Sequence, residues 1–487
     1  MRICFVASEM APFIKTGGLG DVVGALPKAV ASLGHEVRVF IPNYDGLMSE
    51  IDHLKQVSCE VRVQVGEKNY PITLQMMNLG KTGVQVYLIG NEHFFSRKGV
   101  YLDPDTDKDY EDNDERFIFF ARAVLAIMRE LKFQPDIIHA HDWQTSLIPA
   151  YLKTTHADDS FFNSSRSVLT IHNLAYQGKF KSKRFNLLGL DDKLFMPASG
   201  AFEFYNEVDF LKGGIVYADH ITTVSQKYAD EIQTSEFGCG LEGILAERKT
   251  NLTGILNGVD YTVWSPSCDK QTYARYHIDN LSGKRTNKVE LLNKANLPIR
   301  DKTPLIGLIS RLEDQKGWRL ISDVADRLLS MDVQMVVLGT GQSKYHDLVD
   351  KLQEKYPDKF HGWLMFDDVL AHRIEAASDI FLMPSKFEPC GLNQMYSLKY
   401  GTVPIVRKVG GLADTVVDYD SDTTKGTGFV FEEHSPEAML EAVERAVNLF
   451  KKKRAWIKIM KAGMRQDFSW SRSASKYVEL YQQLVGA

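Results

Sequence analysis

Short runs of β-branched and other apolar residues recur along the chain and alternate with stretches of helical periodicity. Such runs, bounded by turn residues, are typical of buried parallel strands. In the first half they occupy residues 3–7, 37–41, 84–89, 136–140, 168–171 and 221–224. Between two of them, residues 114–131 place apolar side chains at the i, i+3, i+4 and i+7 positions of a helix. The alternation predicts a doubly wound α/β sheet.

A second series of the same kind begins after residue 251. Its expected strands are residues 305–310, 335–338, 380–383 and 404–406, again separated by helical stretches. The turn residues Gly254, Asn257 and Gly258 lie between the two series. At 487 residues the chain exceeds what one hydrophobic core usually supports. The pattern therefore predicts two Rossmann-like halves that meet near residues 251–258.

Composition and charge narrow the class of protein. The chain has 44% hydrophobic and 25% charged residues, close to the globular average. Its 58 basic and 63 acidic residues give a net charge of -5, with no long basic block, which argues against a nucleic-acid or anionic-membrane surface. Five scattered cysteines without a Cys-x-x-Cys pair argue against a disulfide framework or a zinc knuckle. With no signal-peptide core and no apolar run of about 18 residues, we expect a cytoplasmic protein.

The first expected strand-to-helix loop is rich in glycine. Residues 15–21 read KTGGLGD, and a helix is expected to begin near Val22. Glycines let the backbone approach a ligand, the helix start supplies N–H donors for a phosphate, and Lys15 adds a cation. Alternatives are a loop that only turns tightly, or a dinucleotide site. A nicotinamide site would need an acidic residue after the second strand, where Pro42 and Asn43 stand instead.

Two loops of the second half also carry chemistry. Arg311 and Lys316 follow the strand at 305–310, where they could clamp a diphosphate or simply pair in solvent with Glu313 or Asp314. Residues 384–392, PSKFEPCGL, follow the strand at 380–383 and precede a helix. The Glu388 carboxylate could accept hydrogen bonds from sugar hydroxyls while the amides of residues 390–392 face an anion; the alternative is a capped helix with a surface glutamate. No base is evident beside Cys390, so covalent catalysis through its thiol is not favoured.

Six segments in order carry a resemblance to a known family. They are residues 15–21 (KTGGLGD), 139–145 (HAHDWQT), 170–173 (TIHN), 255–260 (ILNGVD), 311–317 (RLEDQKG) and 387–392 (FEPCGL). Together they resemble the bacterial glycogen synthases and plant starch synthases that use ADP-glucose. The resemblance runs from Met1 to a terminal helix that contains Tyr477 and Tyr481.

The resemblance implies a fold and an activity. The fold is GT-B, an α/β fold of two Rossmann-like domains that face each other across a deep interdomain cleft. Residues 1–252 with 468–487 would form the acceptor-side domain, and residues 253–467 the nucleotide-sugar domain. The enzyme would transfer glucose from ADP-glucose to the non-reducing end of an α-1,4-glucan with retention of configuration. ADP-glucose and a maltooligosaccharide or glucan are then its substrates, with no cofactor, metal, nucleic acid or membrane.

The resemblance also assigns residues. The implied catalytic residues are His172, Glu388, Lys316 and Arg311, with His172 near the anomeric centre. The implied donor-binding residues are Lys15, Gly17, Gly18, Asp21, Asn257, Arg311, Lys316, Phe366, Glu388, Cys390, Gly391 and Leu392. The implied acceptor-binding residues are Asp142, Trp143, Asn173 and Tyr101.

This sequence departs from related patterns at some positions. Many retaining GT-B enzymes carry a second glutamate eight positions after the first, where this chain has Tyr396, as the family pattern also allows. The aromatic residue expected against adenine is Phe366, a ring without a hydroxyl. The acidic stretch 103–109 lacks the glycine and glutamate of an EF-hand, since Lys108 and Asp114 occupy those positions, and no metal is expected there.

Several alternatives stay open. Retention can arise by double displacement through an enzyme nucleophile, or by same-face substitution in which the leaving phosphate takes the acceptor's proton. The chain could be another retaining GT-B enzyme, sucrose-forming or phosphorylase-like, with the same diphosphate clamp. It could also be a non-catalytic glucan binder on the same fold. The sequence does not separate ADP-glucose from UDP-glucose.

Overall fold

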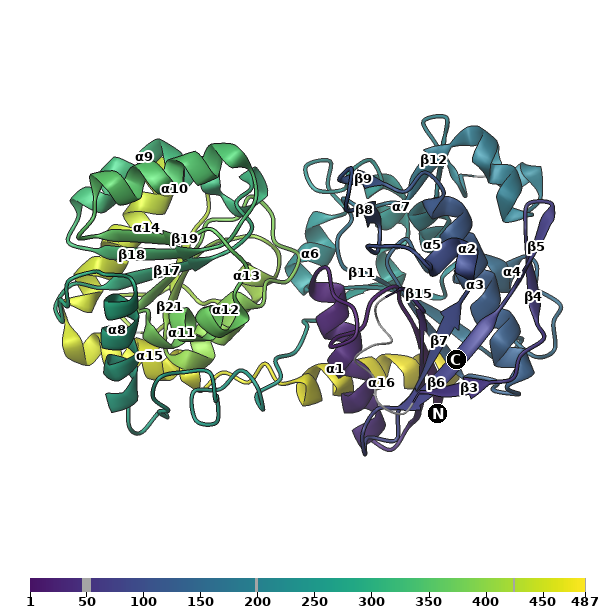
Figure 1. Ribbon diagram of the computed structural model, residues 1–487, viewed down its shortest axis with the longest axis horizontal. Helices are drawn as coiled ribbons and strands as arrows, with labels where there is room; N and C mark the ends of the chain where they lie inside the picture. The colour runs from purple at the N-terminus through teal and green to yellow at the C-terminus, as the bar shows by residue number, and fades with distance from the viewer. Residues whose placement is uncertain (46–53, 198–199, 424, 487) are drawn as a thin grey trace. The chain divides into compact units, whose positions relative to one another are not determined.

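The computed structural model describes residues 1–45, 54–197, 200–423 and 425–486, and the chain folds as two compact units. Unit 1 consists of Met1–Val224, Ala229–Gly258 and Trp470–Ala487. Unit 2 consists of Ser225–Tyr228 and Val259–Ser469. Each unit is built on a mainly parallel sheet covered by helices, so the predicted pair of Rossmann-like folds is confirmed (Figure 1).

The main sheet of unit 1 has the strand order β16-β15-β11-β10-β1-β2-β7-β6-β3 in the described part of the chain. The run from β16 to β7 is parallel, while β6 and β3 are antiparallel additions at one edge. All six predicted strands are present. The strands are β1 (Arg2–Val6), β2 (Glu36–Pro42), β3 (Lys55–Val57), β6 (Thr73–Asn78), β7 (Gln85–Gly90), β10 (Ile137–His141), β11 (Arg166–Ile171), β15 (His220–Thr223) and β16 (Leu252–Gly254).

Two helices share one hydrophobic core with this sheet. Helix α1 (Gly18–Ser32) buries Val22, Leu26 and Val30, residues spaced for one helical face, against strands β1 and β2. Helix α16 (Trp470–Gly486) buries Tyr477 and Tyr481 in the same core. Helices α3 (Asn113–Glu130), α4 (Leu147–Lys153) and α5 (Phe210–Tyr217) pack against one another, and α3 and α4 also contact strands of the sheet.

The rest of unit 1 consists of short elements. They are α2 (Glu92–Phe95), α7 (Glu242–Glu247), η2 (Ser182–Leu188), η3 (Asp192–Phe195), η4 (Lys249–Asn251), and the small sheets β4–β5 (Arg62–Val65, Lys68–Pro71), β8–β9 (Leu102–Asp103, Lys108–Asp109) and β12–β14–β13 (Lys179–Lys181, Glu207–Asp209, Glu203–Phe204). The acidic stretch 103–109 thus lies in the β8–β9 hairpin. Helix α6 (Gln226–Glu231) contains the point where the chain returns from Ser225–Tyr228 to unit 1.

The chain leaves unit 1 after Gly258 and returns to it at Trp470. The two passages run side by side, because Val259 N donates to Phe468 O at 2.7 Å. A Cβ atom at Gly258 would lie 2.5 Å from the Cα of Trp470, so only glycine permits this approach. Helix α16 therefore completes unit 1 although the preceding 211 residues belong to unit 2.

Unit 2 has a fully parallel sheet in the order β19-β18-β17-β20-β21-β22. Its helices cover both faces: α9, α10 and α14 share a core on one face, and α8 and α11 share a core on the other (Figure 1). The strands are β17 (Leu305–Ile309), β18 (Gln334–Leu338), β19 (Phe360–Trp363), β20 (Ile380–Met383), β21 (Val403–Arg407) and β22 (Phe429–Phe431). The helices are α8 (Ser282–Lys294), η5 (Asp314–Lys316), α9 (Trp318–Ser330), α10 (Ser343–Lys355), α11 (Asp368–Ala377), α12 (Asn393–Tyr400), α13 (Gly410–Thr415), α14 (Pro436–Phe450) and α15 (Lys453–Met464).

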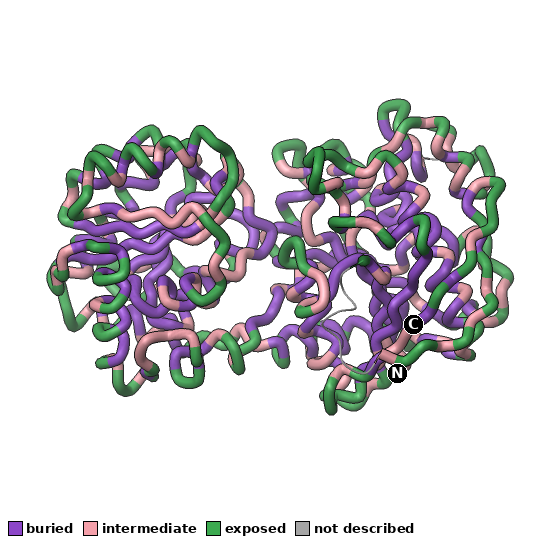
Figure 2. Tube along the Cα trace, in the orientation of Figure 1, coloured by how far each residue is buried: buried purple, intermediate pink, exposed green. Residues whose placement is uncertain are grey.

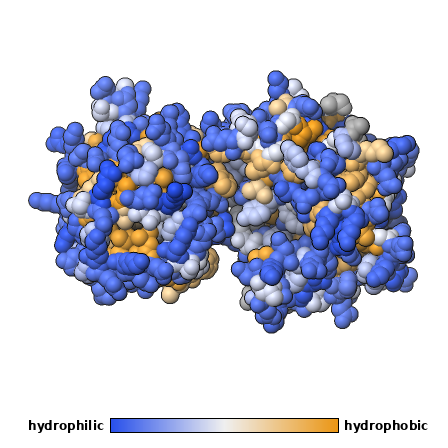
Figure 3. Space-filling model, turned by 90° about the horizontal axis from the view of Figure 1, so that it is seen from above, coloured by the Kyte–Doolittle hydropathy of each residue, from blue (hydrophilic) through white to orange (hydrophobic). Residues whose placement is uncertain are grey.

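Burial follows these layers in both units. The central strands of the two main sheets are almost entirely buried, and exposed residues concentrate on outer helix faces, loops and edge strands such as β3 and β6 (Figure 2). The visible face of each unit is mainly hydrophilic, with apolar side chains gathered in small patches (Figure 3). Within the described ranges, every helix is too short or too polar to span a bilayer.

Candidate active site

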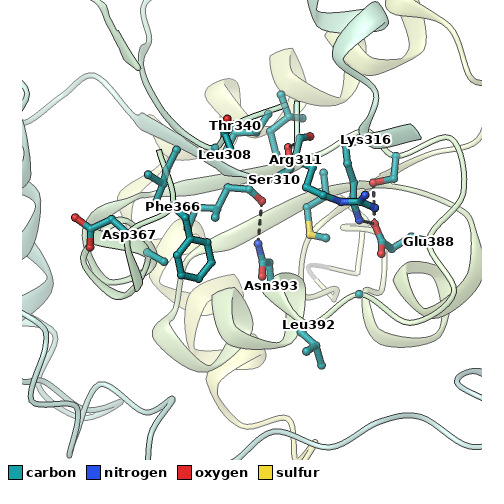
Figure 4. A pocket seen from close by; sticks show the side chains of 18 of the residues that line it. Leu308, Ser310, Arg311, Lys316, Thr340, Phe366, Asp367, Glu388, Leu392 and Asn393 are labelled. Atoms are coloured by element: carbon teal, nitrogen blue, oxygen red, sulfur yellow. Dashed lines mark hydrogen bonds and ion pairs between the residues drawn. The ribbon is translucent and has the colours of Figure 1, made fainter. Parts of the chain in front are cut away.

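Unit 2 contains a pocket of about 320 Å³ at the carboxyl ends of β17, β18 and β20 (Figure 4). Ligands of open α/β sheets bind at such ends. The lining residues include Ser310, Arg311, Lys316, Thr340, Met365, Phe366, Asp367, Glu388, Gly391, Leu392 and Asn393. Six residues assigned from the sequence thus lie around one pocket. The six other donor candidates do not line it: Cys390 is buried, and the rest lie in unit 1, namely Lys15, Gly17, Gly18, Asp21 and Asn257.

Two loops are joined at the charged end of this pocket. Lys386 N donates to Gln315 O at 2.8 Å, and Gln315 Nε2 donates to Phe387 O at 3.3 Å. Gly317 adopts a positive φ of 81°, and a Cβ there would lie 2.1 Å from Pro384 O. Glycine is therefore required where the loop after β17 passes the loop after β20.

The cations of the pocket each have a carboxylate partner. Lys316 Nζ lies 2.6 Å from Glu388 Oε2, which also accepts a hydrogen bond from Ser385 Oγ at 3.0 Å. Arg311 is 3.0 Å from Glu313 Oε1. The Lys316 side chain is 20% exposed and that of Arg311 55%, so Arg311 keeps more of its guanidinium open to a ligand. An anion that enters the pocket would meet both cations beside the buried Glu388.

The start of helix α12 supplies further polar groups to the same pocket. Asn393 Nδ2 donates to Ile309 O at 3.0 Å and so ties the first turn of α12 to the end of β17. Gly391 has a positive φ of 69°, which aims the chain into the helix. The first N–H groups of a helix have no intrahelical acceptors, so this end favours an anionic ligand.

An aromatic side chain lies at the other end of the pocket. The Phe366 side chain is 86% exposed, and Figure 4 shows it apart from Arg311, Lys316 and Glu388. Tyr396, which stands where other enzymes have a second glutamate, stacks on Trp264 with ring centroids 4.0 Å apart. The pocket thus combines a charged end with an exposed ring that a planar group could contact.

In unit 1 the glycine-rich loop begins α1 earlier than expected. The helix starts at Gly18 rather than near Val22, so Gly18 and Gly20 lie in its first turn. A Cβ at Gly20 would lie 3.1 Å from Lys15 Cβ and 3.2 Å from Ile14 O, so a larger residue there would crowd the preceding chain. Lys15 Nζ pairs with Asp21 Oδ1 at 2.8 Å, so these two predicted donor-binding residues contact each other.

A residue that the sequence pattern did not reveal holds this loop. The buried Glu9 carboxylate accepts hydrogen bonds from Thr16 N at 2.6 Å, Thr16 Oγ1 at 2.7 Å and Gly17 N at 3.3 Å. Tyr101 also donates to Glu9, at 2.6 Å, and its hydroxyl lies 2.6 Å from Ser8 Oγ. Burial, then the charge of Glu9, raises the pKa of Tyr101 well above its usual value. The only sequence signal for Glu9 is its place three residues after a buried strand.

The loops after β10 and β11 bring Asp142 and His172 together. Asp142 has a positive φ of 56°, and its Oδ1 accepts from His172 N at 2.7 Å. Burial raises the pKa of Asp142 to about 7, although hydrogen bonds from backbone amides oppose this shift. Burial also lowers the pKa of His172 to about 3, which keeps its imidazole neutral at neutral pH.

The other acceptor candidates have structural contacts. Trp143 is buried, and a Cβ at Gly178 would lie 2.4 Å from Trp143 Cε3, so the backbone at Gly178 covers the indole. The same ring packs edge-on against Phe117 at 5.0 Å. Asn173 Oδ1 accepts from Ala175 N at 3.1 Å and shapes the turn after His172.

Comparison with known proteins gives the family. A model of the starch synthase catalytic domain matches residues 2–247, and a model of glycosyl transferases group 1 matches residues 290–462. The glycogen synthase of Koribacter versatilis is 47% identical over 99% of this chain and 98% of its own length. That of Pseudothermotoga lettingae is 46% identical over 100% of this chain and 99% of its own.

Solved structures agree with these matches. The catalytic domain of starch synthase IV from Arabidopsis thaliana, bound to ADP and acarbose, has a TM-score of 0.91 and 35% identity over 100% of this chain and 99% of its own. Sucrose-phosphate synthase from Thermosynechococcus elongatus has a TM-score of 0.61 at 17% identity over 100% and 99%, a likeness of fold alone. The chain therefore belongs to the glycogen synthase and starch synthase family of glycosyltransferases, with the GT-B fold.

Proposed function

We propose that this protein is a glycogen synthase that transfers glucose from ADP-glucose to the non-reducing end of an α-1,4-glucan with retention of configuration. The observation that carries the proposal is the pocket of unit 2, with Arg311, Lys316 and Glu388 at one end and the exposed Phe366 ring at the other. The similar starch synthase IV structure, which is bound to ADP and acarbose, supports the same donor and acceptor classes here.

The charged end of the pocket suits the departing diphosphate. Transfer breaks the anomeric C–O bond, so negative charge develops on the leaving group and positive charge on the sugar ring. Preorganised cations at the leaving group are then the largest expected catalytic contribution. Arg311 and Lys316 would supply them together with the N–H groups of α12 and the Lys15 cation. Lys316 would exchange part of its contact with Glu388 for the diphosphate.

The glucosyl group would lie between residues that bind hydroxyls. The Glu388 carboxylate would accept hydrogen bonds from sugar hydroxyls. The amides of residues 390–392 would face the sugar phosphate, and Asn257 would add a polar contact. His172 would lie near the anomeric centre. We propose same-face substitution, in which the leaving phosphate takes the acceptor's proton, as the route to retention.

The acceptor is assigned to a domain of residues 1–252 with 468–487, whose bounds differ by a few residues from those of unit 1, and the nucleotide sugar to a domain of residues 253–467. Asp142 and Asn173 would contact the glucan directly. Trp143 and Tyr101 would support the acceptor site without touching the glucan, because Gly178 covers Trp143 and the Tyr101 hydroxyl donates to Glu9. Cytoplasmic localisation, expected from the sequence, belongs to this proposal.

The test is glucosyl transfer from ADP-glucose and UDP-glucose, run in parallel, onto maltooligosaccharides. We expect chain growth that favours ADP-glucose and collapses in Glu388→Ala. The control is Glu437→Ala, which removes an exposed glutamate of the same unit that pairs with Arg327 at 3.2 Å. No growth with either donor, or full activity in Glu388→Ala, would overturn the proposal in favour of another acceptor or a non-catalytic glucan binder.

A further inference from the structure

Three imidazole rings lie in series inside unit 1. His139 and His141 occupy alternate positions of β10, so both side chains project from the same face of the strand. Their rings stack with centroids 4.2 Å apart. The next contact leads outward, because His141 Nδ1 lies 3.0 Å from Nε2 of His172 in the loop after β11. The first two rings are fully buried, whereas His172 is only half-buried.

The two buried rings differ in their partners. His139 is bonded at both nitrogens, to Tyr481 Oη at 2.7 Å and to Thr170 Oγ1 at 2.5 Å. His141 has only the bond to His172, and within the described chain its buried Nε2 has no hydrogen-bond partner. Because Nδ1 of His141 has a hydrogen-bond partner and Nε2 has none in the described chain, the position of the ring proton can be deduced.

A neutral imidazole carries one N–H and one bare nitrogen. If the His141 proton were on Nε2, a buried N–H would have no acceptor, an arrangement that folded proteins avoid. If it is on Nδ1, that N–H donates to His172 Nε2 and the bond is satisfied. Neutrality itself follows from burial, which lowers the pKa of His139 and His172 to about 3 and that of His141 well below its usual value.

The groups around His172 do not compete for this bond. The Asp142 carboxylate accepts from the backbone N of His172 and not from its ring. Phe5 stacks on His141 at 6.0 Å between centroids and offers no hydrogen-bonding atom. Nε2 of His172 is therefore left to accept from His141.

We propose that His141 is a positioning residue that donates its Nδ1–H to Nε2 of His172 and thereby fixes His172 as the Nδ1–H tautomer. The half-buried ring then offers an N–H donor, never a bare acceptor, at Nδ1. This deepens the proposed function, on which the identity of the ligand rests: the donor suits a hydroxyl oxygen of a bound sugar. His141 itself touches no substrate in this role.

The tautomer can be measured without any substrate. Protein labelled with 15N-histidine is examined at pH 7.5 by two-bond 1H–15N correlation, and the His172 signals are identified by their loss in His172→Gln. We expect a protonated Nδ1 and a bare Nε2 on His172. In His141→Leu the two tautomers should mix, and in His141→Asn, whose amide nitrogen stands near the position of Nδ1, the Nδ1–H form should return. An Nε2–H tautomer or an imidazolium at His172 in the unaltered protein overturns the proposal.

Activity supplies a second, independent readout. We expect His141→Leu to lower kcat about tenfold with little change in acceptor KM, as for other partners that fix a ring's tautomer, and His141→Asn to recover most of it. On a His172→Ala background, His141→Leu should cost nothing more, because its effect runs through the missing ring. Additive losses contradict the positioning role. If the protein transfers no glucose at all, the proposed function fails while the NMR result still decides the tautomer.

Discussion

The two units present their functional side chains in opposite electrostatic states. In unit 2 the pocket holds ion pairs that remain partly open to solvent, such as Lys316 with Glu388 and Arg311 with Glu313. Around His172 in unit 1 the side chains are half-buried and carry less charge, since burial lowers the pKa of His172 to about 3 and raises that of Asp142 to about 7, which leaves this carboxyl only partly ionised at neutral pH. One site is therefore built from charge and the other from hydrogen bonds.

The difference matches the charge that develops during transfer. A departing diphosphate gains negative charge, and accessible cations stabilise it. The sugar ring gains positive charge, and in our proposal His172 lies near this ring, where a protonated imidazole would oppose the change. A neutral imidazole can orient a hydroxyl without this penalty. The comparison predicts that substitutions in unit 2 act through charge, whereas those in unit 1 act through geometry and proton placement.

The largest expected effect comes from removing a pocket cation. Lys316→Ala should lower kcat by about a hundredfold or more, on the order of 3 kcal/mol, because leaving-group charge loses a preorganised partner. The measurement is turnover at saturating donor. Lys355→Ala, which removes an exposed lysine paired with Asp326 at 2.7 Å in the same unit, is the control and should leave turnover unchanged. Near-normal turnover in Lys316→Ala would show that the positive charge of Lys316 does not stabilise the leaving group.

The buried, neutral ring of His139 predicts that the stability of the protein depends on pH. Folded His139 takes up a proton only near pH 3, whereas an unfolded histidine does so near pH 6.5. Between those values only the unfolded state is protonated, so acid destabilises the protein through this group, by about 2 kcal/mol between pH 8 and pH 5. The stability advantage of the unaltered protein over His139→Gln should shrink by that amount in equilibrium denaturation.

Asp209 provides a control of opposite sign. Burial raises its pKa to about 7, from 3.8, so its contribution to stability is present near pH 5 and is lost as the pH rises through 7. The advantage of the unaltered protein over Asp209→Asn should therefore grow on acidification. If both differences were independent of pH, the two groups would not be held neutral by burial.

A smaller effect is expected from the support of the glycine-rich loop. Glu9→Gln should raise the KM for the donor about tenfold, because hydrogen bonds to a buried carboxylate are worth more than those to an amide. Tyr101→Phe removes one of the four donors and should do less. A larger effect on kcat than on KM in Glu9→Gln would contradict a role in holding the donor-binding loop.

The smallest effect is expected at the aromatic end of the pocket. Phe366→Ala should weaken nucleotide binding about three- to tenfold, the worth of one aromatic stack, and leave folding intact because the ring is exposed. Calorimetry with ADP measures it. Val417→Ala, which truncates another exposed apolar residue of unit 2, is the control. If Phe366→Ala and the unaltered protein bound ADP equally well, the nucleotide base would not contact Phe366.

Much of the fold was predictable because parallel strands carry a strong local signal. The buried runs at 3–7 and 305–310 read as strands from composition alone. The edge strands β6 and β3 were missed, because a half-exposed antiparallel edge mixes polar and apolar residues, as in β6. The early start of α1 was not predicted, because Gly18 and Gly20 are poor helix formers; at Gly20 the preceding chain lies too close for a larger residue.

The candidate site was less readable from sequence. Arg311, Lys316 and Glu388 follow strand ends, so topology alone gathers them. Glu9 gave no comparable signal, because its role depends on a loop that folds back seven residues later. The bond between His141 and His172 depends on the register of two adjacent strands and on burial, neither of which a motif records.

Helix α16 also imposes an order of construction on the polypeptide. During synthesis the strands of unit 1 leave the ribosome first, yet Tyr481, which bonds to His139, and the Tyr477 core contact are made only after all of unit 2 has been translated. Domains tend to fold as units during synthesis. Unit 2 can therefore complete its fold before unit 1, in which the part of the sheet core that α16 covers stays open until the last helix has been translated.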